Sequence, residues 1–438
     1  MKSIQRGQAL HGDLSVSPDR EMLLFAMTLG ALARGRTLID DCPITTISQD
    51  FAVWMQANHM ECSHRDSTWK IEGAGLSGSF SPFQSLPQNH LARHLALCIL
   101  SRDHETLFDF GGETAEANLQ TSLTGQFKGK WEKGLWSFSA PDLRWKLAPS
   151  GEIPHFTRIR ILLQALLHEL PLALEEKATT RDQLCGMLAF FGAPILIETT
   201  GAEEMDELAR RMARLQGQKF EKKFLTKLEP CKVLAGKEVF VPGDPTEACA
   251  LAILASVIPG SEATIRNVCL NPGRAGAFNA LKRMGANIEV VQKKERYGDQ
   301  FGSIRVQSCK RLVGRKFSAD IMMTCTEEVP LLSIAASLAE GESILRLPEH
   351  EAKERHRVLE IMTANLKKAG VEVGVYEEGI VVRGREELDS ASFDAREEPG
   401  VALALTVLGR IAHGHTELDG SECLELEFPG LQSRLGIT

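Results

Sequence analysis

The stretch VFVPGDPTEACALAILASVIPGSEATIRNVCLNPGRAGAFNALKRMGANIEVV, from Val239 to Val291, alternates strand and helix patterns and decides the fold. Strands favour β-branched and aromatic residues, whereas an apolar run that ends at proline or glycine indicates a buried helix. The pattern predicts strands at 239–241, 264–268 and 287–291, and helices at 247–257 and 276–284. Such alternation is typical of α/β proteins.

Turn residues separate these elements. Pro242-Gly243-Asp244-Pro245 supplies a tight turn, and either Asp244 or Thr246 can cap the helix that follows. Pro259-Gly260 ends that helix, because proline cannot continue it and glycine readily adopts the left-handed capping conformation. Gly285 ends the second helix in the same way. We therefore give these glycines a backbone role and no part in chemistry.

A sequence pattern of helix, glycine and strand recurs along the chain. ALARGRTLI ends at Ile39, SVIPGSEATI at Ile265, SLAEGESILRL at Leu347 and GRIAHGHTEL at Leu418. The glycines at 260, 341 and 414 are 81 and 73 positions apart, so a unit of this size fits the 438 residues about six times. Buried helices are also predicted at 22–33 and 154–174. One unit is too small to bury its own helices, so several must pack together.

Composition indicates a globular protein of two domains. A chain of 438 residues exceeds what one core usually holds, and 43% hydrophobic with 25% charged residues is ordinary. A formal net charge of −8 argues against nucleic-acid binding. The ten cysteines form no CxxC pair and no metal-like grouping with histidine, which predicts reduced thiols in the cytoplasm and no metal site. Without a signal-peptide or transmembrane pattern, we expect no membrane contact.

The quoted stretch resembles the corresponding segment of the EPSP synthase (3-phosphoshikimate 1-carboxyvinyltransferase) family. Further matches follow in register: TRDQLCGMLAFFGA (180–193), EEVPLLSIAASLAEGESIL (327–345), KERHR (353–357) and FPG (428–430). The resemblance implies the enolpyruvyl transferase fold, an inside-out α/β barrel of six βαβαββ units, three in each domain. It places the first domain at residues 15–232 and the second at residues 1–14 plus 233–438.

The resemblance also implies a reaction. Members of the family join a hydroxyl of shikimate 3-phosphate to C2 of phosphoenolpyruvate and expel phosphate, a step of chorismate and aromatic amino acid biosynthesis. Such chemistry needs cations around two phosphates and a carboxylate, and carboxylates that move protons. We therefore expect small anionic ligands, namely phosphoenolpyruvate and shikimate 3-phosphate or an analogue, and a cytoplasmic monomer that needs no cofactor.

Seven residues fall on family positions that carry this chemistry. The resemblance gives catalytic roles to two carboxylates: Glu327, which serves the shikimate hydroxyl, and Glu354, which is placed for proton transfer. It gives substrate-binding roles to five cations: Arg20, Arg93, Arg181, Lys353 and Arg357. Charged side chains at helix starts and on helix faces are also typical of caps and solvated surfaces. A structural role is therefore the alternative for Arg20, Arg181, Glu327 and the three of the seven that lie in the segment 353–357.

Other family positions have lost their charge. The family's phosphoenolpyruvate lysine aligns with Leu426, between two glutamates, and its Asp-His-Arg motif aligns with Glu398-Pro399-Gly400. Two lysines and two arginines are lost in all, and each lost charge-assisted hydrogen bond would forgo about 1.5–3 kcal/mol of binding free energy. His155 aligns with the serine of a phosphate-binding Ser-Ala-Gln. It is either a replacement acid or base or, as is commoner for an isolated histidine, structural.

Two functional interpretations remain open. The first is an enolpyruvyl transferase acting on an altered substrate, which the retained Lys-Glu-x-x-Arg motif at 353–357 favours. The second is a non-catalytic relative, a pseudoenzyme that keeps the fold for ligand binding, regulation or assembly, which the lost cations favour. A related transferase acting on a UDP-sugar is disfavoured, because no cysteine falls in a recognisable catalytic loop of that kind.

Overall fold

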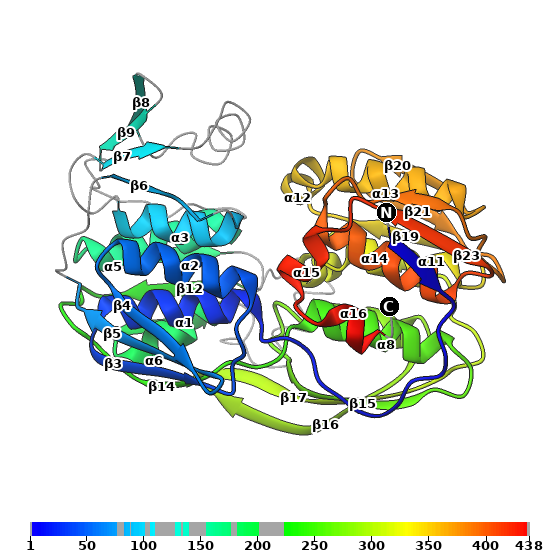
Figure 1. Ribbon diagram of the computed structural model, residues 1–438, viewed down its shortest axis with the longest axis horizontal. Helices are drawn as coiled ribbons and strands as arrows, with labels where there is room; N and C mark the ends of the chain where they lie inside the picture. The colour runs from blue at the N-terminus through cyan, green and yellow to red at the C-terminus, as the bar shows by residue number, and fades with distance from the viewer. Residues whose placement is uncertain are drawn as a thin grey trace, which may run out of the picture. The chain divides into compact units, whose positions relative to one another are not determined.

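A computed structural model describes residues 2–76, 83–87, 89–100, 106–109, 128–132, 135–139, 155–176, 182–200 and 223–435. The chain forms two compact units (Figure 1). Unit 1 comprises Met1–Arg20 and Pro242–Thr438, and unit 2 comprises Glu21–Val241. Each unit alternates helices with strands, which confirms the predicted α/β class and the two-domain organisation.

Unit 1 joins two N-terminal strands to the C-terminal half of the chain. Its helices are α8 (Pro245–Val257), α9 (Gly276–Arg283), α10 (Ala319–Met322), the 3₁₀ helix η1 (Met323–Cys325), α11 (Val329–Ser337), α12 (Glu349–Glu354), α13 (His356–Lys368), α14 (Pro399–Ile411), α15 (Cys423–Glu427) and α16 (Leu431–Arg434). Its strands are β1 (Lys2–Gln5), β2 (His11–Leu14), β15 (Glu262–Cys269), β16 (Asn287–Arg296), β17 (Asp299–Gln307), β18 (Lys316–Phe317), β19 (Glu342–Arg346), β20 (Glu372–Tyr376), β21 (Gly379–Arg383), β22 (Ser392–Asp394) and β23 (His415–Asp419).

Three nearly apolar helices, α8, α11 and α14, contact one another in the core of unit 1. Each has proline in its first turn, where the missing N–H is not needed. The Asp244 carboxylate caps α8 by accepting hydrogen bonds from the backbone N–H groups of Thr246 and Glu247. Every residue of α8 except Val257 is buried. The predicted helix and its cap are therefore confirmed, and the core of unit 1 consists of helices covered on all sides.

Open sheets surround these helices and repeat one pattern of strand pairing. In the first sheet β2 pairs in parallel with β15, which continues into the antiparallel strands β17 and β16. The sheet β18-β19-β21-β20 repeats this order and direction, and the third sheet, β22-β23-β1, keeps the parallel pair and one antiparallel strand. None of the sheets in the described ranges is closed.

Unit 2 repeats the same scheme. Its helices are α1 (Arg20–Leu32, of which Arg20 itself belongs to unit 1), α2 (Thr46–Ala57), α3 (His90–Leu100), α5 (His155–Leu167) and α6 (Gln183–Phe191). Its strands are β3 (Ala33–Asp40), β4 (Glu61–Arg65), β5 (Thr68–Ala74), β6 (Phe83–Ser85), β7 (Thr106–Asp109), β8 (Lys128–Glu132), β9 (Leu135–Ser139), β10 (Leu172–Glu176), β11 (Ile195–Thr200), β12 (Lys223–Leu228), β13 (Leu234–Ala235) and β14 (Glu238–Phe240). The described strands form the sheets β13-β3-β5-β4, with β14 also on β3, β6-β7-β9-β8 and β10-β12-β11.

The predicted C-terminal end of one helix in unit 2 is wrong. The sequence predicts a helix from Pro154 to Leu174, but α5 ends at Leu167 and β10 begins at Leu172. Glu169 has a left-handed backbone, with φ of 52°, and Pro171 follows two residues later. Both features stop a helix, and they outweigh the apolar run on either side. The predicted buried helix at 22–33 is confirmed as α1, whose residues from Glu21 to Leu32 are all buried.

The described part of the chain contains no helix that is long and apolar enough to cross a membrane. All ten cysteines are thiols, and eight of them are buried. Burial raises the pKa of the Cys62 thiol to about 12, so this side chain remains protonated near neutral pH.

Gly285, which separates α9 from β16, offers a direct test of the recurring glycine. Its φ is +94°, and an added Cβ would meet no atom within 4 Å, so Gly285→Ala changes only the conformational preference. We expect a loss of about 1–2 kcal/mol in the free energy of unfolding, measured by urea titration. Gly374→Ala is the matched control, because Gly374 has equal space and no left-handed backbone. Equal stabilities of the two variants would contradict this role.

Candidate active site

The starts of α8, α11 and α14 lie close together in unit 1. The Thr246 hydroxyl, in the first turn of α8, donates a hydrogen bond to Oε1 of Glu328, the N-cap of α11, at 2.6 Å. A Cβ at Gly400, in the first turn of α14, would lie 3.9 Å from the carbonyl oxygen of Glu327. Helix N-termini carry partial positive charge. This end of the unit therefore favours negatively charged groups.

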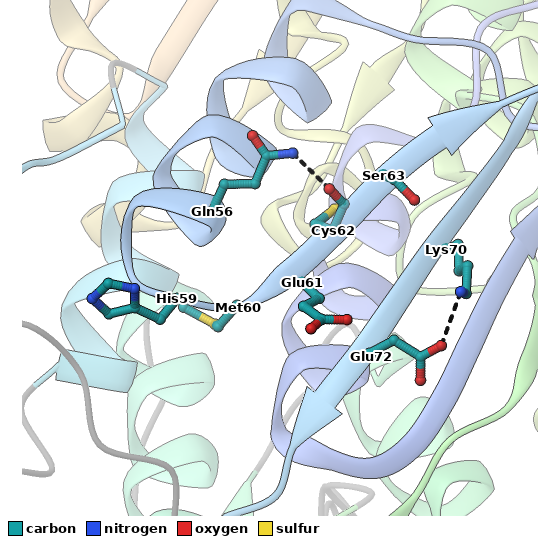
Figure 2. Close-up of a pocket in the computed structure, with 8 residues that line it drawn as sticks. All are labelled: Gln56, His59, Met60, Glu61, Cys62, Ser63, Lys70 and Glu72. Atoms are coloured by element: carbon teal, nitrogen blue, oxygen red, sulfur yellow. Dashed lines mark hydrogen bonds and ion pairs between the residues drawn. The ribbon is translucent and has the colours of Figure 1, made fainter.

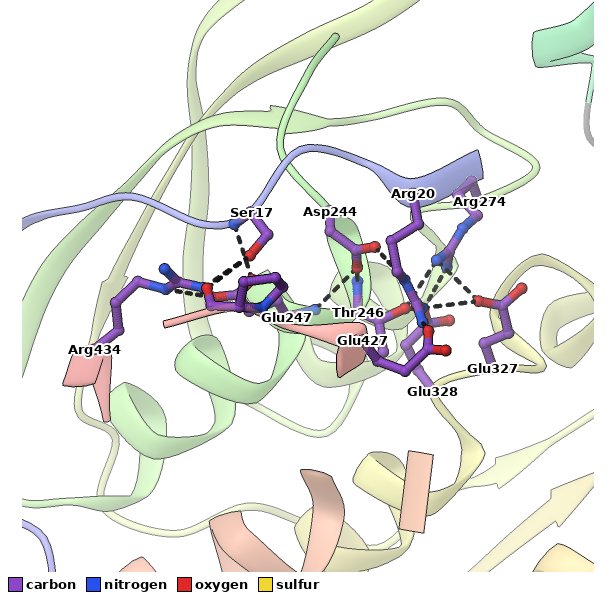
Figure 3. A network of polar contacts seen from close by, with 11 residues as sticks. Ser17, Arg20, Asp244, Thr246, Glu247, Arg274, Glu327, Glu328, Glu427 and Arg434 are labelled. Atoms are coloured by element: carbon purple, nitrogen blue, oxygen red, sulfur yellow. Dashed lines mark hydrogen bonds and ion pairs between the residues drawn. The ribbon is translucent and has the colours of Figure 1, made fainter. Parts of the chain in front are cut away.

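Arg20 extends its guanidinium into this region (Figure 3). Its Nε donates to Asp244 Oδ2 at 3.1 Å, its Nη1 donates to Glu427 Oε2, and its Nη2 lies 3.8 Å from Glu327 Oε2. The Phe428 ring centroid is 4.5 Å from Cζ of Arg20. Burial lowers the pKa of Arg20, but the three carboxylates raise it by more, so the pKa is above its ordinary value. Arg20 is thus a permanent cation already in contact with three acidic side chains.

Arg274 lies beside Arg20, with only 2% of its side chain exposed. Its Nη2 donates to Glu327 Oε2 at 3.0 Å and to Thr246 Oγ1 at 2.8 Å, and its Nη1 donates to Glu328 Oε1. Burial lowers the pKa of Arg274, but Glu327 and Glu328 outweigh it, and the pKa is well above its ordinary value. No role for Arg274 was predicted from the sequence. The only signal was one arginine in the loop NPGRAG between a strand and a helix.

These side chains form what we call the Arg20 cluster. Its members are Arg20, Asp244, Arg274, Glu327, Glu328 and Glu427. Two guanidinium groups face four carboxylates, so the formal net charge is −2. A site that must attract phosphates and a carboxylate needs a positive surplus. The cluster has cations in place, but its own acidic residues neutralise them.

The segment 353–357 spans the junction of α12 and α13, and it supplies the most exposed of the predicted cations that lie in the described ranges. Lys353 is 70% exposed, and its ammonium contacts Glu349 at 2.7 Å across one helical turn. Arg357 is 68% exposed, and its Nε lies 3.5 Å from Oε1 of Glu398, the N-cap of α14. Exposed pairs of this kind are weak and yield readily to a ligand. Glu354 is the last residue of α12, and its side chain lies outside what the structure describes.

Arg355, within the same segment, has a positioning role that the sequence did not suggest. Its Nη2 donates to Thr326 Oγ1 at 3.4 Å, and Thr326 directly precedes Glu327. Its Nε also donates to Glu351 of α12 at 2.8 Å. Arg355 therefore connects the start of α13 to the turn that carries Glu327. The structure brings Glu327 together with Arg20 and links both α12 and α13 to this turn.

For the two predicted binding residues of unit 2, Arg93 and Arg181, the structure does not test a role in substrate binding. Arg93 lies in α3, where it is half-buried and its Nε donates to the carbonyl of Pro87 at 3.0 Å. Burial lowers the pKa of Arg93, with the Asp50 carboxylate acting in the opposite sense. Arg181 lies outside the described residues. A substrate-binding role for either arginine stays a prediction.

His155 is paired with a carboxylate of another helix. It is the first residue of α5, and its Nε2 contacts Oε1 of Glu21, which lies in the first turn of α1. The two side chains are 19% and 10% exposed. The carboxylate fixes the orientation of the imidazole and brings negative charge beside it. An acid–base role for His155 stays a prediction.

Unit 2 also has a surface hollow of about 450 Å³ (Figure 2). It is lined by Gln56, His59, Met60, Glu61, Cys62, Ser63, Lys70 and Glu72. Its main polar groups already have partners: the Gln56 amide donates to the Cys62 carbonyl at 2.6 Å, and Lys70 contacts Glu72 at 3.1 Å. None of the predicted site residues lines this hollow. We assign it no chemistry.

Comparison with solved structures identifies the class of fold. The chain superposes on an EPSP synthase from Acinetobacter baumannii with a TM-score of 0.75 and 19% identity, over 99% of this chain and 97% of that one. It superposes on the enolpyruvyl transferase NikO from Streptomyces tendae with a TM-score of 0.71 and 16% identity, over 99% and 96%. The fold is therefore that of the enolpyruvyl transferases.

Sequence comparison identifies the family within this class. The family model for EPSP synthase (3-phosphoshikimate 1-carboxyvinyltransferase) matches residues 155–435. The chain is 27% identical to the 3-phosphoshikimate 1-carboxyvinyltransferase of Synechococcus sp. strain JA-3-3Ab, over 98% of this chain and 94% of the relative. It is 28% identical to that of Synechococcus sp. strain RCC307, over 98% and 97%. The chain belongs to the EPSP synthase family.

Proposed function

We propose that this protein transfers the enolpyruvyl group of phosphoenolpyruvate to a hydroxyl of an acceptor that carries less negative charge than shikimate 3-phosphate. Membership of the EPSP synthase family supports enolpyruvyl transfer as the reaction. The observation that carries the choice of acceptor is the charge of the Arg20 cluster, in which four carboxylates surround two guanidinium groups. A further phosphate would be repelled by this excess.

The retained residues have distinct roles in this proposal. Lys353 and Arg357, both highly exposed and weakly paired, hold the phosphoenolpyruvate anion. Glu327 is 29% exposed and held by Arg274 and Arg20, so its carboxylate is available to accept the proton of the acceptor hydroxyl. Arg20 and Arg274 orient Glu327. Glu354, at the end of α12, is the candidate for the second proton transfer.

The second candidate is a non-catalytic relative that binds a small anion without converting it. The specific observation in its favour is that Arg20 already contacts three carboxylates of the chain itself. A cation in such surroundings attracts a ligand anion poorly. In this case Lys353 and Arg357 would bind an anion, and no bond would be broken.

The test is phosphate release from phosphoenolpyruvate, with shikimate or shikimate 3-phosphate as the acceptor. We expect release with shikimate at a rate equal to or above that with shikimate 3-phosphate. Glu327→Gln should lower the rate by about 10²–10⁴-fold, because it removes the base and keeps the shape of the side chain. Glu340→Gln is the matched control, since Glu340 is exposed and follows the far end of α11.

Each alternative has its own outcome in this assay. A preference of more than tenfold for shikimate 3-phosphate would refute the proposed acceptor. Heat of phosphoenolpyruvate binding without release of phosphate for either acceptor would favour the non-catalytic candidate.

A further inference from the structure

We propose that Glu427 occupies an anion subsite on Arg20 and thereby determines which ligands this subsite accepts. The inference takes its ligand class, small carboxylates and phosphate esters such as phosphoenolpyruvate, from the proposed function. Glu427 is the last residue of α15, and its Oε2 accepts a hydrogen bond from Nη1 of Arg20. A ligand carboxylate or phosphate oxygen would use the same terminal donor.

Exposure distinguishes this pair from the rest of the Arg20 cluster. The side chains of Arg20 and Glu427 are 19% and 17% exposed, whereas those of Arg274 and Glu328 are 2% and 0% exposed. The inner pair, Arg274 and Glu328, is therefore a structural ion pair sealed from solvent. The outer pair reaches solvent, so a ligand can compete with the Glu427 carboxylate for Arg20.

Glu427 is not needed to neutralise Arg20. Without it, the guanidinium would still donate to Asp244, which is 1% exposed, and would still lie against the Phe428 ring. The cluster would also change from a formal net charge of −2 to −1. Glu427 thus adds a third carboxylate to a cation that has two others, and its main electrostatic effect is to exclude further anions.

The segment that follows Glu427 is anchored. Nη2 of Arg434 donates to the carbonyl of Pro429 at 2.9 Å and to Oγ of Ser17 at 2.8 Å. The backbone N–H of Gly430 donates to Oε1 of Glu425 at 2.6 Å. These contacts fix the backbone on the C-terminal side of Glu427 and so place its side chain beside Arg20. Occupation of the subsite is therefore built into the fold.

The experiment is calorimetric titration of the full-length protein and its variants with phosphoenolpyruvate and, separately, with inorganic phosphate. Glu427→Gln removes the charge, and Glu427→Ala also removes the hydrogen bond to Arg20. We expect both variants to bind phosphoenolpyruvate at least tenfold more tightly than the unmodified protein. Glu422→Gln is the matched control, because Glu422 is an exposed glutamate at the start of the same helix, and we expect its affinity to stay within twofold.

A second variant connects the gain to Arg20. Adding Arg20→Met to Glu427→Ala should abolish the increase in affinity. Unchanged or weaker binding in both Glu427 variants, with circular dichroism like that of the unmodified protein, would overturn the inference, and so would a gain that persists without Arg20. Because the readout is binding heat and needs no turnover, failure of this inference is distinguishable from failure of the proposed reaction, which is read from phosphate release.

Discussion

Arg274→Met is expected to lower the free energy of unfolding of unit 1 by about 3–5 kcal/mol, the range for removal of one partner from a buried ion pair. Arg274 is 2% exposed and Glu328 is 0% exposed, so the substitution leaves a carboxylate with neither solvent nor a counter-ion. Thr246 also loses the hydrogen bond that it accepts from Nη2. Methionine fills a similar volume, so the loss comes mainly from charge and hydrogen bonding and not from a cavity.

The chain offers an internal control for this measurement. Its five tryptophans, at 54, 69, 131, 136 and 145, lie in unit 2, and its two tyrosines, Tyr297 and Tyr376, lie in unit 1. Tryptophan fluorescence during urea titration therefore reports unit 2, whereas far-ultraviolet circular dichroism reports the helices and strands of both units. We expect Arg274→Met to shift part of the circular-dichroism transition to lower urea concentration while the tryptophan-fluorescence transition stays in place.

Two further variants separate charge from packing in this prediction. Glu328→Gln, added to Arg274→Met, should restore part of the stability, because the buried group is then neutral. Arg383→Met is the matched control: Arg383 pairs with Glu372 at 3.4 Å on the surface, and loss of such a pair costs about 0–1 kcal/mol. A loss below 1 kcal/mol in Arg274→Met would show that the pair is not the stabilising interaction described here.

The elements of the fold were predictable where their signals are local. Asp244 caps α8 within three residues, and Gly260 and Gly285 end their helices with φ of +81° and +94°, so a short window contains both cause and effect. The end of α5 was missed although Pro171 is a local stop signal, and the left-handed backbone of Glu169 has no signature in a glutamate. Apolar periodicity continued past it into β10 and favoured a longer helix.

The Arg20 cluster could not be derived from local patterns. Arg20 and Glu427 are 407 positions apart, and Arg20 and Asp244 are 224 apart, so only the tertiary fold brings them together. The resemblance to a family supplied Arg20 and Glu327 as candidates, but it gave no reason to pair either with Arg274. A buried arginine in a loop looks the same in sequence as an exposed one, and its burial follows from the packing of α8 against α11.

Arg434→Met is expected to be the second most destabilising substitution, with a loss of about 3 kcal/mol near neutral pH, at the lower end of the range for a broken buried pair. Nε of Arg434 donates to Oε1 of Glu247 at 2.6 Å, and Glu247 is 0% exposed. The backbone N–H of Ser17 donates to the other carboxylate oxygen at 2.8 Å. The variant keeps this second hydrogen bond, so the loss should be smaller than in Arg274→Met.

The loss in the free energy of unfolding in Arg434→Met should depend on pH, and the pKa of Glu247 sets the direction. Burial raises the pKa of Glu247 above its ordinary value of 4.5, while Arg434 and the Ser17 N–H oppose this rise. Without Arg434 the pKa of Glu247 rises further. A carboxyl group with a raised pKa in the folded state stabilises that state at low pH and loses this effect as pH rises through the raised pKa. The destabilisation should therefore be largest at pH 8 and shrink as pH falls toward 5.

Urea midpoints at pH 5 and pH 8 measure this change in stability. Glu247→Gln added to Arg434→Met is the control in which the pH dependence disappears. The same loss at pH 5 and pH 8 in Arg434→Met would show that Arg434 stabilises unit 1 through its contacts with Ser17 and Pro429 and not through the charge of Glu247.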